Sequence, residues 1–64
     1  MVIIEQHPNM DNWINVNLYN KLVDQFTSRP EALRLAKALA RKHGTGIMDL
    51  DNDSEIKVKW AKSY

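Results

Sequence analysis

Apolar and polar residues alternate in two stretches of the chain. Aliphatic residues take every second position between residues 13 and 19, and the same alternation returns between residues 55 and 60. Side chains of a strand point alternately to its two faces, so each stretch predicts a strand with one apolar face. The predicted inward positions are Ile14, Val16, Leu18, Ile56, Val58 and Trp60.

Three shorter stretches also favour strands. Residues 2–6 form a β-branched run, residues 47–50 form a short apolar run, and residues 22–26 predict a further short strand. Between the strands, turn-forming residues predict a loop at residues 7–12, a tight turn at Asn20 and Lys21, and a turn at residues 51–54. Residues 47–50 and 55–60 would therefore pair as an antiparallel hairpin.

The middle of the chain carries the signals of a helix. Ser28 and Glu31 match a capping box, and Pro30 fits the first turn, where backbone N–H groups have no helical partner. Gly44 suits the left-handed position that follows a last turn, so the helix should end at about His43. Its apolar stripe consists of Ala32, Leu35, Ala36, Leu39 and His43.

These elements predict one α+β domain over residues 1–64. Their order is β-β-(β)-α-β-β, where the bracketed strand is residues 22–26. One helix can cover only one face of a sheet. We therefore expect two layers, an antiparallel sheet of four or five strands and a single helix, with one face of the sheet uncovered.

The same segments resemble a family of small uncharacterised bacterial proteins. The resemblance rests on a Trp-x-Val-type strand, a Ser/Thr-x-x-Glu-Ala helix start, an alanine-rich basic helix and a closing hairpin. In this chain they correspond to Trp13 to Val16, Phe26 to Ala32, Ala36 to Gly44, an acidic turn before Ile56, and a final Ser63-Tyr64. The chain departs from the family in its last turn, which has Asn52-Asp53-Ser54 in place of Asp-Gly. The resemblance implies the fold and no site residues.

Composition narrows the class of protein. The 64 residues contain no cysteine, so neither a disulfide nor a tetrathiolate zinc site can form. No apolar run approaches the roughly 20 residues of a membrane span, and the first residues lack the basic and apolar regions of a signal peptide. We therefore expect a cytoplasmic protein with no membrane partner. Small domains without covalent staples often gain stability by dimerising.

Catalytic and metal-binding patterns are weak. Asp49, Asp51 and Asp53 match the opening of a calcium loop, but Ser54 replaces the required glycine and Trp60 replaces the final glutamate. A solvated acidic hairpin turn explains these residues better. His7 and His43 match no zinc spacing, and no nucleophile lies in a catalytic pattern. From the sequence we expect a protein that is not an enzyme and that binds neither a metal ion nor a cofactor.

The uncovered sheet face is the preferred candidate site. It would present an aromatic and amide surface, and protein interfaces are enriched in aromatic residues. The predicted interface residues are Trp13, Asn15, Asn17, Tyr19, Lys57 and Lys59. The alternative for Trp13 is that it closes the core at the sheet edge. We expect a non-enzymatic module that binds a protein partner or itself, with an accessory or modulator role such as one in a phage or mobile element.

The alternative function is nucleic-acid binding by the outer side of the helix. Residues 28–43 carry a net charge of +4, and the outward cations are Arg34, Lys37, Arg41 and Lys42. Spacings of three and four residues align cations along one side of a helix, where they could follow a phosphate backbone. Against this alternative, the whole chain has a net charge of only +1, and a charged outer side also keeps a helix solvated.

Overall fold

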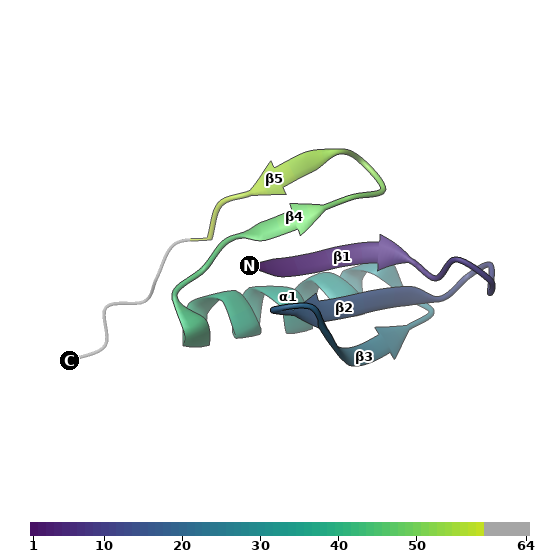
Figure 1. Ribbon diagram of the computed structural model, residues 1–64, viewed down its shortest axis with the longest axis horizontal. Coiled ribbons are helices and arrows are strands. Elements are labelled where there is room, and N and C mark those ends of the chain that lie inside the picture. Colours follow the sequence, from purple (N-terminus) through teal and green to yellow (C-terminus); the bar gives the residue numbers. More distant parts are fainter. Residues whose placement is uncertain (59–64) are drawn as a thin grey trace.

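The computed structural model describes residues 1–58 and has an α+β fold (Figure 1). In chain order its elements are β1 (Val2–Gln6), β2 (Ile14–Leu18), β3 (Lys21–Phe26), α1 (Arg29–His43), β4 (Ile47–Asp49) and β5 (Ser54–Ile56). The strands form one sheet in the order β3-β2-β1-β4-β5, and α1 packs on one face of it. The predicted fold class and the predicted third strand are therefore confirmed.

The sheet is mixed, which corrects the prediction of an entirely antiparallel sheet. β1 lies in the centre, antiparallel to β2 and parallel to β4, whereas β4 and β5 form the predicted antiparallel hairpin. The helix causes the parallel pair. Because α1 carries the chain back across the sheet after β3, β4 starts at the same end of the sheet as β1.

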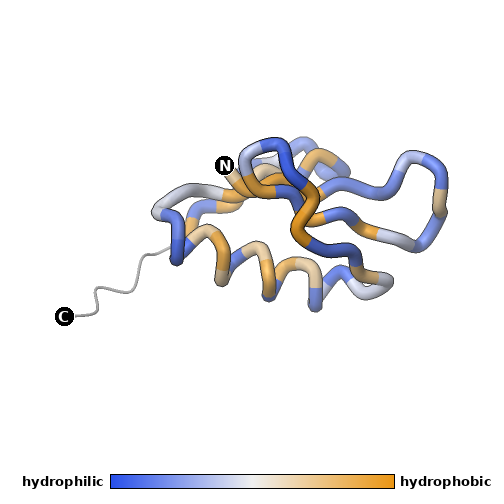
Figure 2. The backbone as a smooth tube through the Cα atoms, turned by 60° about the horizontal axis from the view of Figure 1, so that its bottom comes forward, coloured by the Kyte–Doolittle hydropathy of each residue, from blue (hydrophilic) through white to orange (hydrophobic). Residues whose placement is uncertain are grey.

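The core lies between α1 and the sheet face that α1 covers (Figure 2). The sheet contributes fully buried Val2, Ile4, Val16 and Ile47, and the helix contributes Ala32, Ala36 and Ala40. Small alanine side chains let the helix backbone lie close to the strands. Predicted inward residues surround this centre, partly buried: Ile14, Leu18, Leu35, Leu39, Ile56 and Val58. Trp60, also predicted to point inward, lies outside the described residues.

The helix ends where the sequence predicts, but its start is held differently. Gly44 has the left-handed φ of 63°, and the N–H groups of Gly44 and Thr45 both donate to the carbonyl of Ala40, which caps the last turn. Ser28 has the extended backbone of an N-cap residue, yet its side chain makes no capping hydrogen bond. The predicted capping box is therefore wrong. The start of α1 is tied down instead by ion pairs of Arg29.

The hairpin between β2 and β3 turns one residue earlier than predicted. Tyr19 and Asn20 form the turn, with φ values of 50° and 68°, in place of the predicted Asn20 and Lys21. A two-residue hairpin turn of this type needs positive φ at both central positions, and here both positions adopt it although neither is glycine. A register shift then leaves Val23 without a partner in β2, since Asn17 pairs with Leu22 and Val16 with Asp24.

Candidate interaction surfaces

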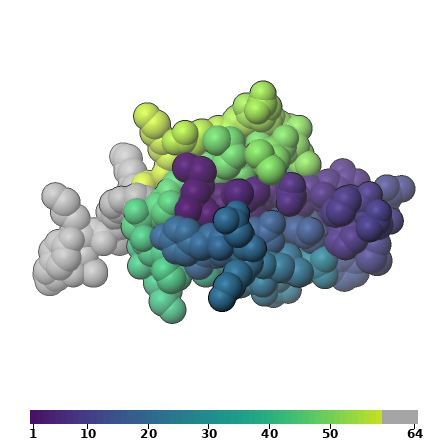
Figure 3. All heavy atoms as spheres, in the orientation of Figure 1, coloured from purple at the N-terminus to yellow at the C-terminus, as the bar shows by residue number. Residues whose placement is uncertain are grey.

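The face of the sheet opposite α1 has no covering layer among residues 1–58. Figure 3 views this face directly, and α1 lies behind the sheet in the same orientation of Figure 1. Strand register places one row of residues across all five strands. In sheet order the row is Leu22, Asn17, Ile3, Met48 and Glu55. We call these residues and their neighbours Asn15, Glu5 and Gln25 the open face.

The two predicted interface asparagines lie on the open face, where other side chains already bond to them. The Asn15 Oδ1 accepts a hydrogen bond of 2.8 Å from the Gln25 side chain, and the Asn17 Nδ2 donates one of 3.4 Å to Glu5. These pairs connect β3 to β2 and β2 to β1. The amides therefore help to hold the sheet in register, and each keeps further hydrogen-bonding capacity for a partner.

The other predicted interface residues are divided among three locations. Trp13 is half-buried directly before β2, with its backbone bonded to His7 and Met10, so it is neither fully exposed nor fully enclosed. Lys57 is exposed after β5. Tyr19 does not belong to the open face, because the early turn carries it to the end of α1, where its ring meets His43. Lys59 lies outside the described residues.

Sequence patterns missed the apolar members of the open face. Ile3 and Met48 are half-buried partners in the parallel β1–β4 pair, and Leu22 is 55% exposed at the edge. The run Val2-Ile3-Ile4 is apolar throughout, with no alternation of apolar and polar residues. The hydrophobic pattern therefore could not indicate that Ile3 faces away from the helix. A central strand with apolar residues on both faces was the available signal, since such runs are typical of strands buried on both sides.

The four predicted helix cations lie on the exposed side of α1. Arg34, Lys37, Arg41 and Lys42 are all exposed. Within residues 1–58, the observed ion pairs involve Arg29 alone, so these four side chains stay unpaired in the described part of the chain. The sequence contains no aspartate or glutamate between Ala32 and Met48. The outer side of α1 is therefore cationic from Arg34 to Lys42, and Glu31 in the first turn is the one acidic residue of the helix.

A buried carboxylate joins the start of the helix to the last hairpin. Asp49 is 3% exposed and forms an ion pair with Arg29, while Arg29 also donates to Asp51 at 3.3 Å. The Asn52 side chain donates to Asp49 at 2.9 Å, and the backbone N–H of Gln6 donates to Asp51 at 3.0 Å. The prediction of a solvated acidic turn is therefore wrong for Asp49. Its carboxylate fastens the hairpin to α1.

Charge and hydrogen bonding set the titration of this pair. The hydrogen bond from Arg29 lowers the pKa of Asp49, partial removal from water acts in the opposite direction, and Asn52 adds to the lowering. The hydrogen bond to Asp49 likewise raises the pKa of Arg29. Asp49 is therefore ionised at neutral pH and paired with Arg29, which fits a structural role for its carboxylate.

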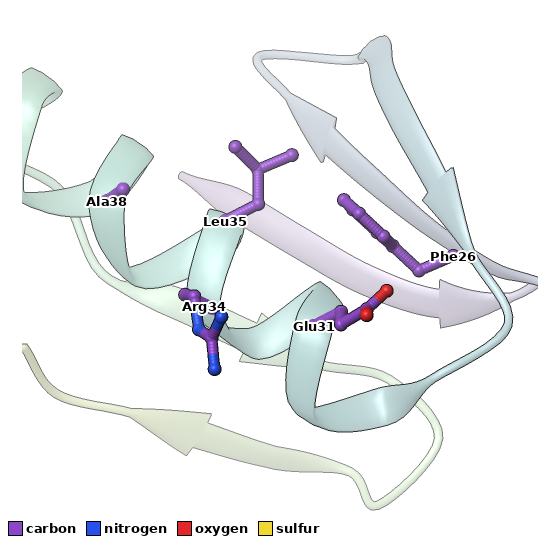
Figure 4. A pocket seen from close by; sticks show the side chains of 5 residues that line it. All are labelled: Phe26, Glu31, Arg34, Leu35 and Ala38. Atoms are coloured by element: carbon purple, nitrogen blue, oxygen red, sulfur yellow. The ribbon is translucent and has the colours of Figure 1, made fainter.

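A shallow groove of about 390 Å³ runs along the outer edge of the core. Its lining residues are Phe26, Glu31, Arg34, Leu35 and Ala38. Figure 4 shows the Phe26 ring extending from the end of β3 toward Leu35, while Arg34 points away from both. The volume lies in the range of small-molecule sites, but polar groups do not converge in it as they do in such sites. We therefore assign it no ligand.

The described residues form no metal site and no membrane span. Residues 1–58 contain no group of three or more histidine, aspartate or glutamate side chains placed to hold a metal ion. The helix of the described region is too short and too polar to cross a bilayer. Comparisons with models of known families, with curated proteins and with solved structures found no match for the chain. The family resemblance of the sequence therefore stays a prediction.

Proposed function

We propose that this protein is a non-enzymatic interaction module that binds a second protein surface, either a partner or another copy of itself, through the open face. The observation that supports the proposal is a sheet face that α1 does not cover, on which Ile3 and Met48 are adjacent apolar residues and Leu22 lies beyond Asn17 at the edge. A protein partner is the usual cover for an uncovered face with apolar and amide groups.

The size of the open face sets the expected strength of binding. The strands β1 to β5 have 5, 5, 6, 3 and 3 residues. At about 3.3 Å per residue and about 4.8 Å between strands, they span roughly 350 Å². Stable complexes bury about 800 Å² on each partner. The open face alone is therefore suited to a transient complex. Trp13 at one end and Lys57 at the other extend the surface that a partner could touch.

Site-specific photo-crosslinking tests the proposal. A photoreactive amino acid is placed at Met48 on the open face or, as a control, at Met10, which is 49% exposed in the loop between β1 and β2. In cells of the native host, Met48 should give a discrete protein adduct and Met10 should not. The adduct mass separates a homodimer from a foreign partner. Equal crosslinking at both positions, or none at Met48, would contradict the proposal.

A further inference from the structure

The outer side of α1 carries cations that are not paired within the described part of the chain. They are Arg34, Lys37, Arg41 and Lys42, all of them exposed and none of them in a salt bridge with a residue between 1 and 58. α1 forms a layer of its own beside the sheet (Figure 2). No described element packs on its outer side, so a ligand can approach these cations directly.

The cations are spread around the outer side of the helix. At about 100° per residue, Lys37 and Lys42 lie about 140° apart around the helix axis, and Arg34 and Arg41 lie between them. Arg34 precedes Arg41 by two turns, which is about 10 Å along the axis. A polyanion on this side would therefore meet positive charge along the middle of the helix and on both flanks.

The acidic side chains lie mostly away from this surface. Asp49 and Asp51 are bound by Arg29 at the N-terminal end of α1. Glu31 lies in the first turn, before the four cations begin. Charges are screened beyond about 8 Å at physiological ionic strength, so the local excess of cations decides what this side attracts, and the net charge of the whole chain matters less.

The helix offers positive charge without other groups that recognise bases. Its sequence contains no asparagine, glutamine, serine or threonine to bond base edges, and no phenylalanine, tyrosine or tryptophan on which an unpaired base could stack. Its remaining exposed residue among the cations is Ala38. Contacts from such a surface go to phosphates, which position a nucleic acid without reading its sequence.

We infer that the outer side of α1 binds double-stranded DNA through its phosphates, independently of base sequence. A duplex carries one negative charge per about 1.7 Å of its axis, twice the density of one strand. A surface that acts by charge alone therefore favours the duplex. This site lies on the side of the molecule opposite the open face and does not depend on the protein partner proposed above.

The spread of the cations favours DNA over duplex RNA. The major groove of B-DNA is about 12 Å wide and admits an α-helix. A helix in that groove would bring Lys37 and Lys42, on its two flanks, toward the phosphates of opposite strands. The major groove of duplex RNA is too narrow for side chains to enter, so the same cations would reach fewer phosphates.

Fluorescence anisotropy over a salt series tests the inference. The probe is a labelled DNA duplex of about 15 base pairs, which exceeds one helical turn. Four phosphate contacts predict that log K falls with log salt at a slope of about −3.6, so binding should weaken about a hundredfold between about 50 and 200 mM salt. A duplex of unrelated sequence should bind within about threefold. The single strand and a duplex RNA of equal length should bind several times more weakly.

Variants that each remove one charge locate the site. Arg34→Gln and Arg41→Gln should each make the slope shallower by about 0.9, because each removes one phosphate contact. The control Lys57→Gln removes an exposed cation after β5 and should leave the slope unchanged. Glu31→Gln removes the negative charge nearest the cations in the helix and should tighten binding. Circular dichroism checks that each variant is folded.

Four outcomes would overturn the inference. The first is the absence of duplex binding at low salt, and the second is a change of slope on Lys57→Gln as large as that on Arg41→Gln. Equally tight binding of duplex RNA would show that the helix does not use the wide groove of B-DNA. Equally tight binding of polyglutamate with matched charge would show that the surface attracts acidic polymers in general, and the assignment to DNA would be wrong.

Discussion

Replacing Ile4 with alanine is expected to lower the free energy of unfolding by about 3 kcal/mol. Ile4 is fully buried between the centre of the sheet and α1, and its removal leaves a cavity that the rigid strands around it cannot fill. A domain of 64 residues has a stability of about 3–10 kcal/mol. In a urea titration followed by circular dichroism, the midpoint of unfolding should therefore fall markedly, and a native stability at the low end of this range would leave the variant largely unfolded without urea.

The adjacent residue of the same strand is the matched control. Ile3 has the same side chain but lies half-buried on the open face. Ile3→Ala should cost about 1 kcal/mol, because less apolar surface returns to water. Equal losses for the two variants would mean that both faces of β1 are enclosed, and would contradict the assignment of the open face.

Replacing Asp49 with asparagine is expected to cost about 2 kcal/mol at neutral pH. The change keeps the shape of the side chain but removes the ionic partner of Arg29 at a nearly fully buried position. Arg29 retains Asp51 and is about one-third exposed, so the cost should stay below that of a fully enclosed broken pair. Asp53→Asn, in the exposed turn, should change stability by less than about 0.5 kcal/mol.

The pH dependence of stability tests whether the ionised carboxylate of Asp49 causes this difference in stability. Arg29 lowers the pKa of Asp49 in the folded protein, so the folded state keeps this group ionised where the unfolded state already binds a proton. Its stabilising contribution is complete above the ordinary aspartate pKa of about 3.9 and is lost as pH falls below it. The stability gap between native protein and Asp49→Asn should therefore narrow below about pH 4. A gap of constant size would contradict this role.

Most helix and strand positions could be predicted from the sequence, because they depend on the conformational preferences and hydrophobic pattern of neighbouring residues. Gly44 fixes the end of α1 through its own backbone conformation, and alternation around Val16 places that residue in the core. The same period places Asn15 and Asn17 on the open face. Tyr19 was predicted to be the last residue of the strand, but β2 ends at Leu18 and Tyr19 is the first residue of the turn, where its positive φ turns it away from the open face.

Features that depend on strand order could not be predicted in this way. The amino-acid pattern of β1 does not indicate that this strand is central. The patterns of β1 and β4 do not indicate that the two strands pair in parallel. The contribution of Met48 to the open face follows from that pairing. The pair of Arg29 and Asp49 joins residues 20 positions apart, and no spacing rule connects them. The exposure of the four helix cations could be predicted, but the contact between Tyr19 and His43 required the fold.

Thiol labelling tests the proposed interface most directly. The chain has no cysteine, so Met48→Cys and the control Met10→Cys each introduce a single reactive group. Labelling rates are compared between dilute purified protein and intact cells of the native host, using a membrane-permeant maleimide and normalising each to an unfolded reference. The proposed interface predicts a labelling rate at position 48 that falls severalfold in cells while position 10 is unchanged. A similar ratio at both positions would show that nothing covers the open face, and would contradict the proposed function.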